Sequence, residues 1–102
     1  MLVLWTAGAR ADLLDIIREI AHDRSDTARR VAQTTRSCTH ELSDHPQLGR
    51  VVEEFGNEQI RERVVRPWQV IYRVLPDCVH VLAILHGRRV LSPRSIGLEE
   101  ES

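Results

Sequence analysis

The sequence has no lysine, only two cysteines, few aromatic residues and no long apolar run, and each of these absences narrows what the chain can be. Since all the permanently charged basic side chains are arginines, none of them serves easily as a proton acceptor. The apolar runs fall well short of the roughly 20 residues that a membrane span needs, and the beginning of the chain turns polar too soon for a signal peptide. The sequence therefore predicts a cytoplasmic protein that does not enter a membrane.

The cysteines and histidines show no metal-binding pattern. Cys38 and Cys78 lie far apart without a C-x-x-C partner, so we expect both to be small buried hydrophobic residues rather than a disulfide or thiolate ligands. The five histidines lack the H-x-x-H and H-E-x-x-H spacings of metal sites. Aromatic residues make up 4% of the chain, too few for a base-stacking surface. We therefore expect no metal and no cofactor, and direct binding to nucleic acid is the weaker hypothesis.

The chain does have enough apolar residues, 42% of 102, to form one folded domain. Its charge is distributed unevenly, because residues 58 to 98 carry seven arginines against Glu58, Glu62 and Asp77, while the net charge of the chain is −1. Such a field attracts acidic partners. Glutamates 99–101 then follow in a segment with nothing to bury. We expect a single domain over residues 1–93 and a flexible acidic tail over residues 94–102.

Periodicity predicts an α+β fold of two layers. A short apolar strand precedes Thr6, which suits a helix cap, and a second cap is expected at Ser25 or Asp26. Asp44-His45-Pro46 ends the second helix, because the residue before a proline is disfavoured in a helix. An irregular stretch reaches about Asn57, and three apolar segments separated by turn residues then predict a meander. The order is β-α-α-β-β-β, an N-terminal helical hairpin packed on a mainly antiparallel sheet: strand 2–5, helix from about 7 to 23, a second helix between the cap at Ser25 or Asp26 and Asp44-His45-Pro46, and strands 59–65, 69–75 and 78–86.

Six segments occur in an order that matches a known superfamily. They are W-T (5–6), D-L-L-D-I-I-R-E-I-A (12–21), H-P-Q-L-G-R (45–50), I-R-E (60–62), V-I-Y-R-V (70–74) and I-L-H-G-R-R (84–89). Over about residues 3 to 91 the chain resembles the ParE/RelE toxin superfamily. The resemblance implies a toxin of a type II toxin–antitoxin system, of the kind involved in plasmid stabilisation, which inhibits growth until a cognate ParD/RelB-like antitoxin neutralises it. Toxins of the ParE branch poison DNA gyrase, and those of the RelE branch cut messenger RNA on the ribosome.

The end of the domain resembles the ParE branch more closely. The nucleases of the RelE branch share basic and acid–base residues on the concave sheet face, commonly with a C-terminal tyrosine, whereas this chain has no tyrosine after His86 and no lysine. We therefore favour a toxin that acts by protein contact, without catalytic residues, and DNA gyrase is its expected target by analogy. The alternative is an endoribonuclease acting at the ribosome, in which His86 transfers the proton while arginines hold the phosphate: Arg61, Arg63, Arg73 and Arg88.

The same residues are candidates for binding the target or the antitoxin. We expect Arg61, Arg63, Arg73, His86, Arg88 and Arg89 to form a basic surface for an acidic partner, although each arginine could instead be part of a solvated sheet face. By alternation, Arg61 and Arg63 share the face opposite Ile60, Glu62 and Val64. Glu62 either pairs with Arg73 across adjacent strands or exchanges protons in the nuclease hypothesis.

Leu14 lies off the apolar stripe of the first helix. The resemblance implies that the antitoxin lies against the helical hairpin and the sheet edge, so Leu14 is a candidate for covered surface. An exposed apolar position of this kind could also support a homodimer, or a larger toxin–antitoxin hetero-oligomer.

Overall fold

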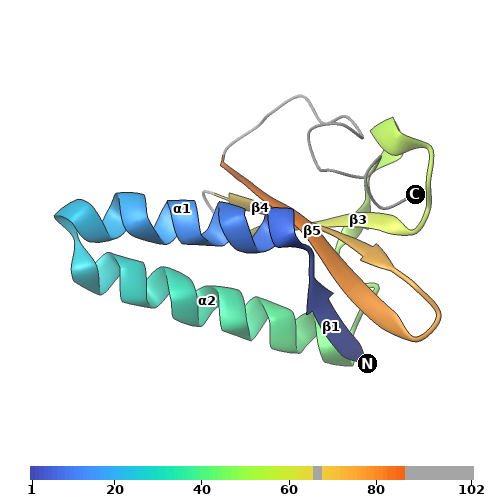
Figure 1. Cartoon of the computed structure of the whole chain (residues 1–102). Helices are drawn as coiled ribbons and strands as arrows, with labels where there is room; N and C mark the ends of the chain where they lie inside the picture. The colour runs from blue at the N-terminus through green and yellow to red at the C-terminus, as the bar shows by residue number, and fades with distance from the viewer. Residues whose placement is uncertain (66–67, 87–102) are drawn as a thin grey trace.

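The computed structural model describes residues 1–65 and 68–86, apart from the side chains of residues 23 and 86. Two helices pack on one face of a five-stranded sheet, and the predicted two-layer α+β architecture is confirmed (Figure 1). The turn expected at residues 66–67, the arginines at 88 and 89 and the tail expected over 94–102 lie outside the described residues.

The first helix, α1, spans Ala7–Asp23, as predicted. Thr6 caps it, because its hydroxyl oxygen accepts a hydrogen bond from the Ala9 amide at 3.1 Å. The second helix, α2, spans Ser25–Asp44, and its cap residue is Arg24, which makes no side-chain cap hydrogen bond. The cap expected at Ser25 or Asp26 is therefore wrong by one or two residues, since the two helices follow each other too closely to leave room for a separate capping turn. The helix ends at Asp44, just before His45-Pro46, as predicted.

The sheet contains one strand more than predicted. Its strands are β1 (Leu2–Trp5), β2 (Arg50–Val51), β3 (Ile60–Val65), β4 (Trp68–Val74) and β5 (Cys78–His86), and their order is β1-β5-β4-β3-β2. β1 pairs with β5 in parallel, and the other neighbours are antiparallel, so the sheet is mainly antiparallel, as expected. The short β2 lies in the stretch expected to be irregular, which also contains a 3-10 turn at Glu53–Phe55, η1.

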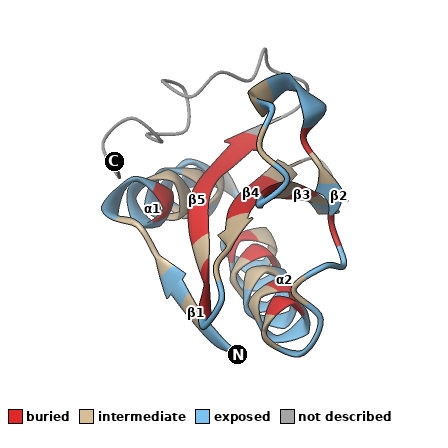
Figure 2. Ribbon diagram, turned by 90° about the vertical axis from the view of Figure 1, so that its right-hand side faces the viewer, coloured by how far each residue is buried: buried red, intermediate tan, exposed pale blue. Residues whose placement is uncertain are grey.

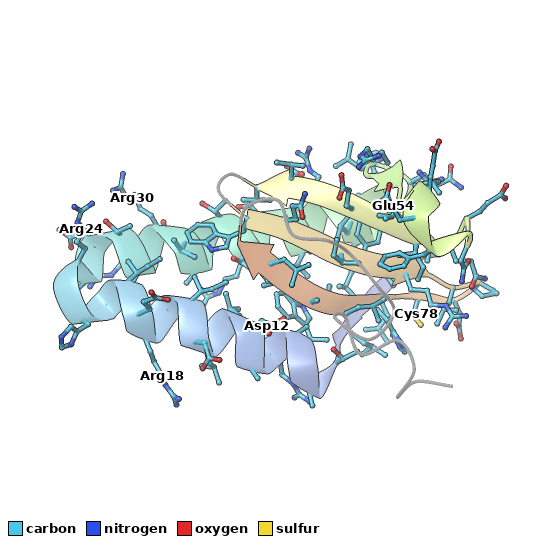
Figure 3. The ribbon with its side chains drawn as sticks, turned by 90° about the horizontal axis from the view of Figure 1, so that it is seen from above. Asp12, Arg18, Arg24, Arg30, Glu54 and Cys78 are labelled. Atoms are coloured by element: carbon cyan, nitrogen blue, oxygen red, sulfur yellow. The ribbon has the colours of Figure 1, made fainter. Side chains whose placement is uncertain are left out.

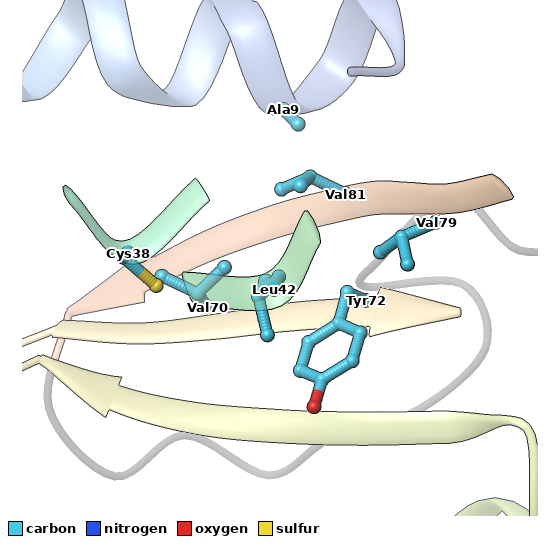
Figure 4. Packing of buried hydrophobic residues seen from close by; sticks show 7 residues of the cluster. All are labelled: Ala9, Cys38, Leu42, Val70, Tyr72, Val79 and Val81. Atoms are coloured by element: carbon cyan, nitrogen blue, oxygen red, sulfur yellow. The ribbon is translucent and has the colours of Figure 1, made fainter. Parts of the chain in front are cut away.

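Both faces of the sheet carry a buried apolar cluster. The cluster under the helices comprises Ala9, Cys38, Leu42, Val70, Tyr72, Val79 and Val81 (Figure 4). The cluster on the opposite face comprises Val52, Ile60, Ile71, Leu82, Ala83 and Leu85, with Phe55 packed against it. β5 lies between β1 and β4 and contributes to both clusters, so its side chains are buried along most of its length (Figure 2). This position explains why its sequence is an almost unbroken apolar run.

The helical hairpin extends beyond the ends of the strands (Figure 1). The apolar side of α1 consists of Ala9, Leu13, Ile16 and Ile20. Ala9, near the beginning of the helix, is fully buried, whereas the other three residues are only half-buried. The sheet therefore buries only the first part of the apolar side of α1. No helix among the described residues is long and apolar enough to cross a membrane.

Candidate functional site

The three arginines of the central strands do not form one surface. In the β3–β4 pair, Arg61 lies opposite Tyr72, and Ile60 lies opposite Arg73. Directly paired residues project to the same face of a sheet. Tyr72 belongs to the cluster under the helices and Ile60 to the cluster on the opposite face, so Arg61 and Arg73 point to opposite faces. The expectation that Arg61, Arg63 and Arg73 together form a basic surface is therefore wrong, because the register of the hairpin separates Arg73 from the other two.

Arg61 holds the segment that connects α2 to the sheet. Its Nη1 donates to the Gly49 carbonyl at 2.7 Å and to the Gln47 carbonyl at 3.4 Å, and the Gly49 amide donates to the Tyr72 hydroxyl at 2.7 Å. Burial raises the pKa of Tyr72, which keeps this hydroxyl protonated. Gly49 is thus fixed through both its amide and its carbonyl. We call Gly49, Arg61 and Tyr72 the Gly49 anchor.

Arg63 connects the sheet to α2. Its Nη2 lies 3.2 Å from Glu41 Oε2, and the two side chains are 37% and 47% exposed. An ion pair of this exposure contributes less than about 1 kcal/mol. Burial raises the pKa of the neighbouring Cys38 thiol, although Arg63 acts in the opposite direction. Cys38 and Cys78 are both free and buried, as predicted.

Glu62 pairs with a residue that the sequence did not single out. Its side chain is buried and accepts a hydrogen bond at 2.5 Å from Nε of Arg50, its neighbour on β2. The expected pairing with Arg73 is wrong, because Glu62 faces Ile71 on β4, and Arg73 Nε donates to Gln59 Oε1 at 3.1 Å. Glu62 raises the pKa of the Arg50 guanidinium further. Arg50 and Glu62 belong to two of the sequence segments quoted above, but nothing in these segments indicated that the two residues are in contact.

The face without helices is apolar at its centre, where a phosphate-binding site would need cations and acid–base groups. Its buried residues on the three middle strands include Ile60, Ile71 and Leu82, and Oε1 of the Glu62 carboxylate accepts a hydrogen bond from Arg50. The described residues hold no group of three or more residues that could bind a metal ion. His86 closes β5 opposite Trp68, and its side chain, like the residues at 88 and 89, lies outside the described part.

A groove opens between α2 and the end of the β3–β4 hairpin. It holds a cavity of about 340 Å³ whose described lining is Thr27, Arg30, Val31, Thr34, Thr35, Val65 and Trp68. At its base, a narrow apolar crevice continues toward α1 and is lined by Leu13, Ile16, Val31, Thr35, Val65, Trp68, Val70 and Ile84. The volume falls in the range of ligand-binding clefts, and the mixture of apolar and hydroxyl groups suits a side chain of a partner. No sequence pattern indicated this groove, because it arises from the extension of the hairpin beyond the strands.

Leu14 lies on the outer face of α1 and is 50% exposed. Its neighbours Leu13 and Ile16 are turned toward the crevice and are half-buried. The prediction that Leu14 lies off the core stripe is therefore confirmed. An exposed leucine on a regular helix needs no functional explanation by itself, but it is available to a partner.

Comparison with known proteins identifies relatives along nearly the whole chain. The model of the family described as ParE toxin of type II toxin-antitoxin system, parDE, matches residues 3–91. Toxin ParE3 of Caulobacter vibrioides is 32% identical over 91 residues, which cover 88% of this chain and 90% of that protein. A solved structure described as the chromosomal ParDE TA system from P. aeruginosa contains a chain with the same fold. Its TM-score is 0.69 at 20% identity, and the match covers 86% of this chain and 97% of that one.

Proposed function

The chain belongs to the ParE toxin family of type II toxin–antitoxin systems, and on this basis we propose that it arrests growth by binding an essential protein, DNA gyrase, until its antitoxin covers it. It is a ParE-type toxin of a type II toxin–antitoxin system, and its antitoxin partner is part of the proposal. The choice of gyrase and the mode of neutralisation are the proposed steps. The proposed site of action is the cytoplasm.

The observation that carries this proposal is that the arginines of the central strands do not converge on one point. Cleavage of a phosphodiester needs cations and a proton-transferring pair directed at one point. Arg61 and Arg63 lie on the helix side and donate to Gly49 and Glu41, while Arg73 lies on the opposite face. This separation does not favour the nuclease hypothesis, and it leaves a toxin that acts by contact with another protein as the better-supported proposal.

We assign the contact with gyrase to the end of β5 and the residues that follow it. His86 closes this strand, and the sequence continues with Gly87-Arg88-Arg89, two consecutive arginines that an acidic surface would attract. Arg61 has a different role in this proposal, since it holds Gly49 rather than a partner.

Induced expression in a bacterium that lacks the antitoxin tests the target. We expect growth to stop and DNA supercoiling to fall while messenger RNA stays intact, because the toxin binds gyrase and cuts no RNA. Supercoiling and message integrity are measured in the same cells, with an Arg88→Ala/Arg89→Ala double variant as the matched control. Cleaved message with normal supercoiling would support the nuclease hypothesis instead, and arrest with neither effect would point to a different target.

The antitoxin is proposed to occupy the groove and the outer face of α1. The volume of the groove is sufficient for one large apolar side chain, and Arg30 is the charged residue among those described that line it. An acidic residue beside the apolar anchor would therefore complement the site. Leu14 lies on the same hairpin, so a segment that wraps around the hairpin can cover both.

Leu14→Asp is expected to weaken antitoxin binding about tenfold, because it replaces an apolar contact by a charge that must be desolvated. The fold of the isolated toxin should remain intact, since Leu14 is half exposed on a helix. Leu48→Asp is the matched control, because Leu48 is a similarly exposed leucine, 46%, outside the hairpin. Isothermal titration with the antitoxin measures both variants, and equal affinities for Leu14→Asp and the wild type would remove Leu14 from the interface.

A further inference from the structure

The second half of β5 loses its strand neighbour on one side. β1 ends at Trp5, which lies opposite Val81, whereas β4 accompanies β5 as far as the pair between Trp68 and His86. From Leu82 onward, β5 therefore has a strand on one edge and α1 near the other. A strand edge of this kind carries amide and carbonyl groups that need partners when water is excluded.

Side chains at the beginning of α1 take the place of the missing strand. The Thr6 hydroxyl donates to the Leu82 carbonyl at 3.2 Å, and the Asp12 carboxylate accepts the Ile84 amide at 3.0 Å. A carbonyl and the amide two residues later are the groups that a neighbouring parallel strand would bind along one edge. Asp12 lies on the side of α1 that faces the sheet (Figure 3). Asp12 contacts the backbone of β5. A substitution of Ile84 would therefore leave the contact in place, unless the new residue were proline.

Asp12 is unusual among the residues of α1 that face inward. Ala9, Leu13 and Ile16 form an apolar stripe, and Asp12 is a half-buried carboxylate beside it. Placing a carboxylate there costs desolvation, which is offset only where the group is hydrogen-bonded. A hydrogen bond from an amide to a charged acceptor is about twice as strong as a neutral one. A carboxylate at position 12 is therefore suited to hold the Ile84 amide and not to add an apolar contact.

Ile84 lies close in sequence to the residues that are proposed to bind the target. It precedes His86 by two residues, and β5 contains a bulge near Leu82, opposite the step from Ile71 to Tyr72. A bulge changes the direction of the strand beyond it. The segment between the bulge and His86 is held on one edge by β4 and on the other by Asp12.

We propose that Asp12 is a positioning residue of the toxin: by holding the Ile84 amide it fixes the end of β5, the part of the described chain to which the proposed target contact is assigned. This inference rests on the proposed function, since it needs that segment to contact the target. It assigns to α1 a part in toxicity that is separate from antitoxin binding.

The test compares Asp12→Leu and Asp12→Asn with the wild type. Leucine keeps the helix and fills the space but accepts no hydrogen bond, whereas the asparagine carbonyl can accept the same one. Amide hydrogen exchange at Ile84 is expected to become about tenfold faster in Asp12→Leu and to change little in Asp12→Asn. The inducer level needed to stop growth should rise about tenfold for Asp12→Leu and return close to the wild-type level for Asp12→Asn. Asp15→Leu, at an exposed position of the same helix, is the control.

The readouts separate this inference from the proposed function. Unchanged exchange at Ile84 in Asp12→Leu would overturn the anchoring role, and faster exchange with full toxicity would overturn its importance for the target. Affinity for the antitoxin should stay within about twofold in both variants, and a parallel loss would mean that Asp12 supports the whole surface rather than the end of β5. A wild-type chain that leaves supercoiling normal but stops growth would refute gyrase as the target, while the comparison of the variants would still decide the role of Asp12.

Discussion

Gly49→Ala is expected to destabilise the toxin by about 3 kcal/mol, at the upper end of the cost of overpacking. A Cβ at this position would lie 2.3 Å from the Glu62 carbonyl oxygen and 2.6 Å from the Tyr72 hydroxyl. The first of these neighbours is backbone within β3, so it yields only if the strand moves. The second is the acceptor of the Gly49 amide, so the substitution also disrupts the hydrogen bond that fixes the connecting segment.

Thermal unfolding measures this effect, and a cost of that size corresponds to a decrease in Tm of about 15 °C for a domain of this length. Gly8→Ala is the matched control, because its Cβ would meet its nearest atoms at 3.9 and 4.0 Å, which is ordinary contact within α1. It should stabilise the protein by about 0.5 kcal/mol through helix propensity. Tyr72→Phe, which removes only the acceptor, should cost about 1–3 kcal/mol for the unpaired Gly49 amide. If Gly49→Ala unfolded at the wild-type temperature, the Gly49 anchor would have no role in stability.

Local patterns were sufficient to predict both helices and the four longer strands of this fold. The helical period gave α1 its observed bounds, Thr6 its role as a cap, and the turn at Pro76-Asp77 the division between β4 and β5. β2 could not be predicted in the same way, since a strand of two residues shows no period. Its position follows from contacts between distant residues, such as Arg50 with Glu62 and Gly49 with Tyr72.

The candidate site was harder to predict, because it depends on register. Alternation within β3 placed Arg61 and Arg63 on one face and Ile60 and Glu62 on the other, as the structure has them. Alternation within one strand does not tell which face of the next strand matches it, and a slip of one residue exchanges the faces. The face of Arg73 was therefore open until its pairing with Ile60 was known. The groove between α2 and the β3–β4 hairpin could not be predicted from the sequence either. It exists because the helices extend beyond the strands, and no local pattern shows how the two lengths match.

Charge reversal at the groove is expected to weaken neutralisation strongly. Arg30→Glu should lower antitoxin affinity by about ten- to a hundredfold, because an acidic residue of the antitoxin would meet a like charge in a partly desolvated site. Arg29→Glu is its matched control, since Arg29 is the exposed neighbour on α2 and does not line the groove. The two variants change the net charge equally, so only their difference reports on the groove. Equal losses, both abolished by salt, would indicate long-range attraction and exclude a specific contact at Arg30.

Filling the groove tests the same interface without changing charge. Thr34 is exposed and lines the cavity of about 340 Å³, so the indole of Thr34→Trp can occupy it with little strain on α2. Such a variant should arrest growth as the wild type does, because the end of β5 is unchanged, yet co-expression of the antitoxin should no longer rescue the cells. Growth with and without antitoxin gives the result directly, and Gln33→Trp, at the exposed position next to it, should remain neutralised. Rescue of both variants would exclude the groove as the antitoxin site. Loss of toxicity in Thr34→Trp alone would instead show that the target, and not only the antitoxin, uses the groove between α2 and the β3–β4 hairpin.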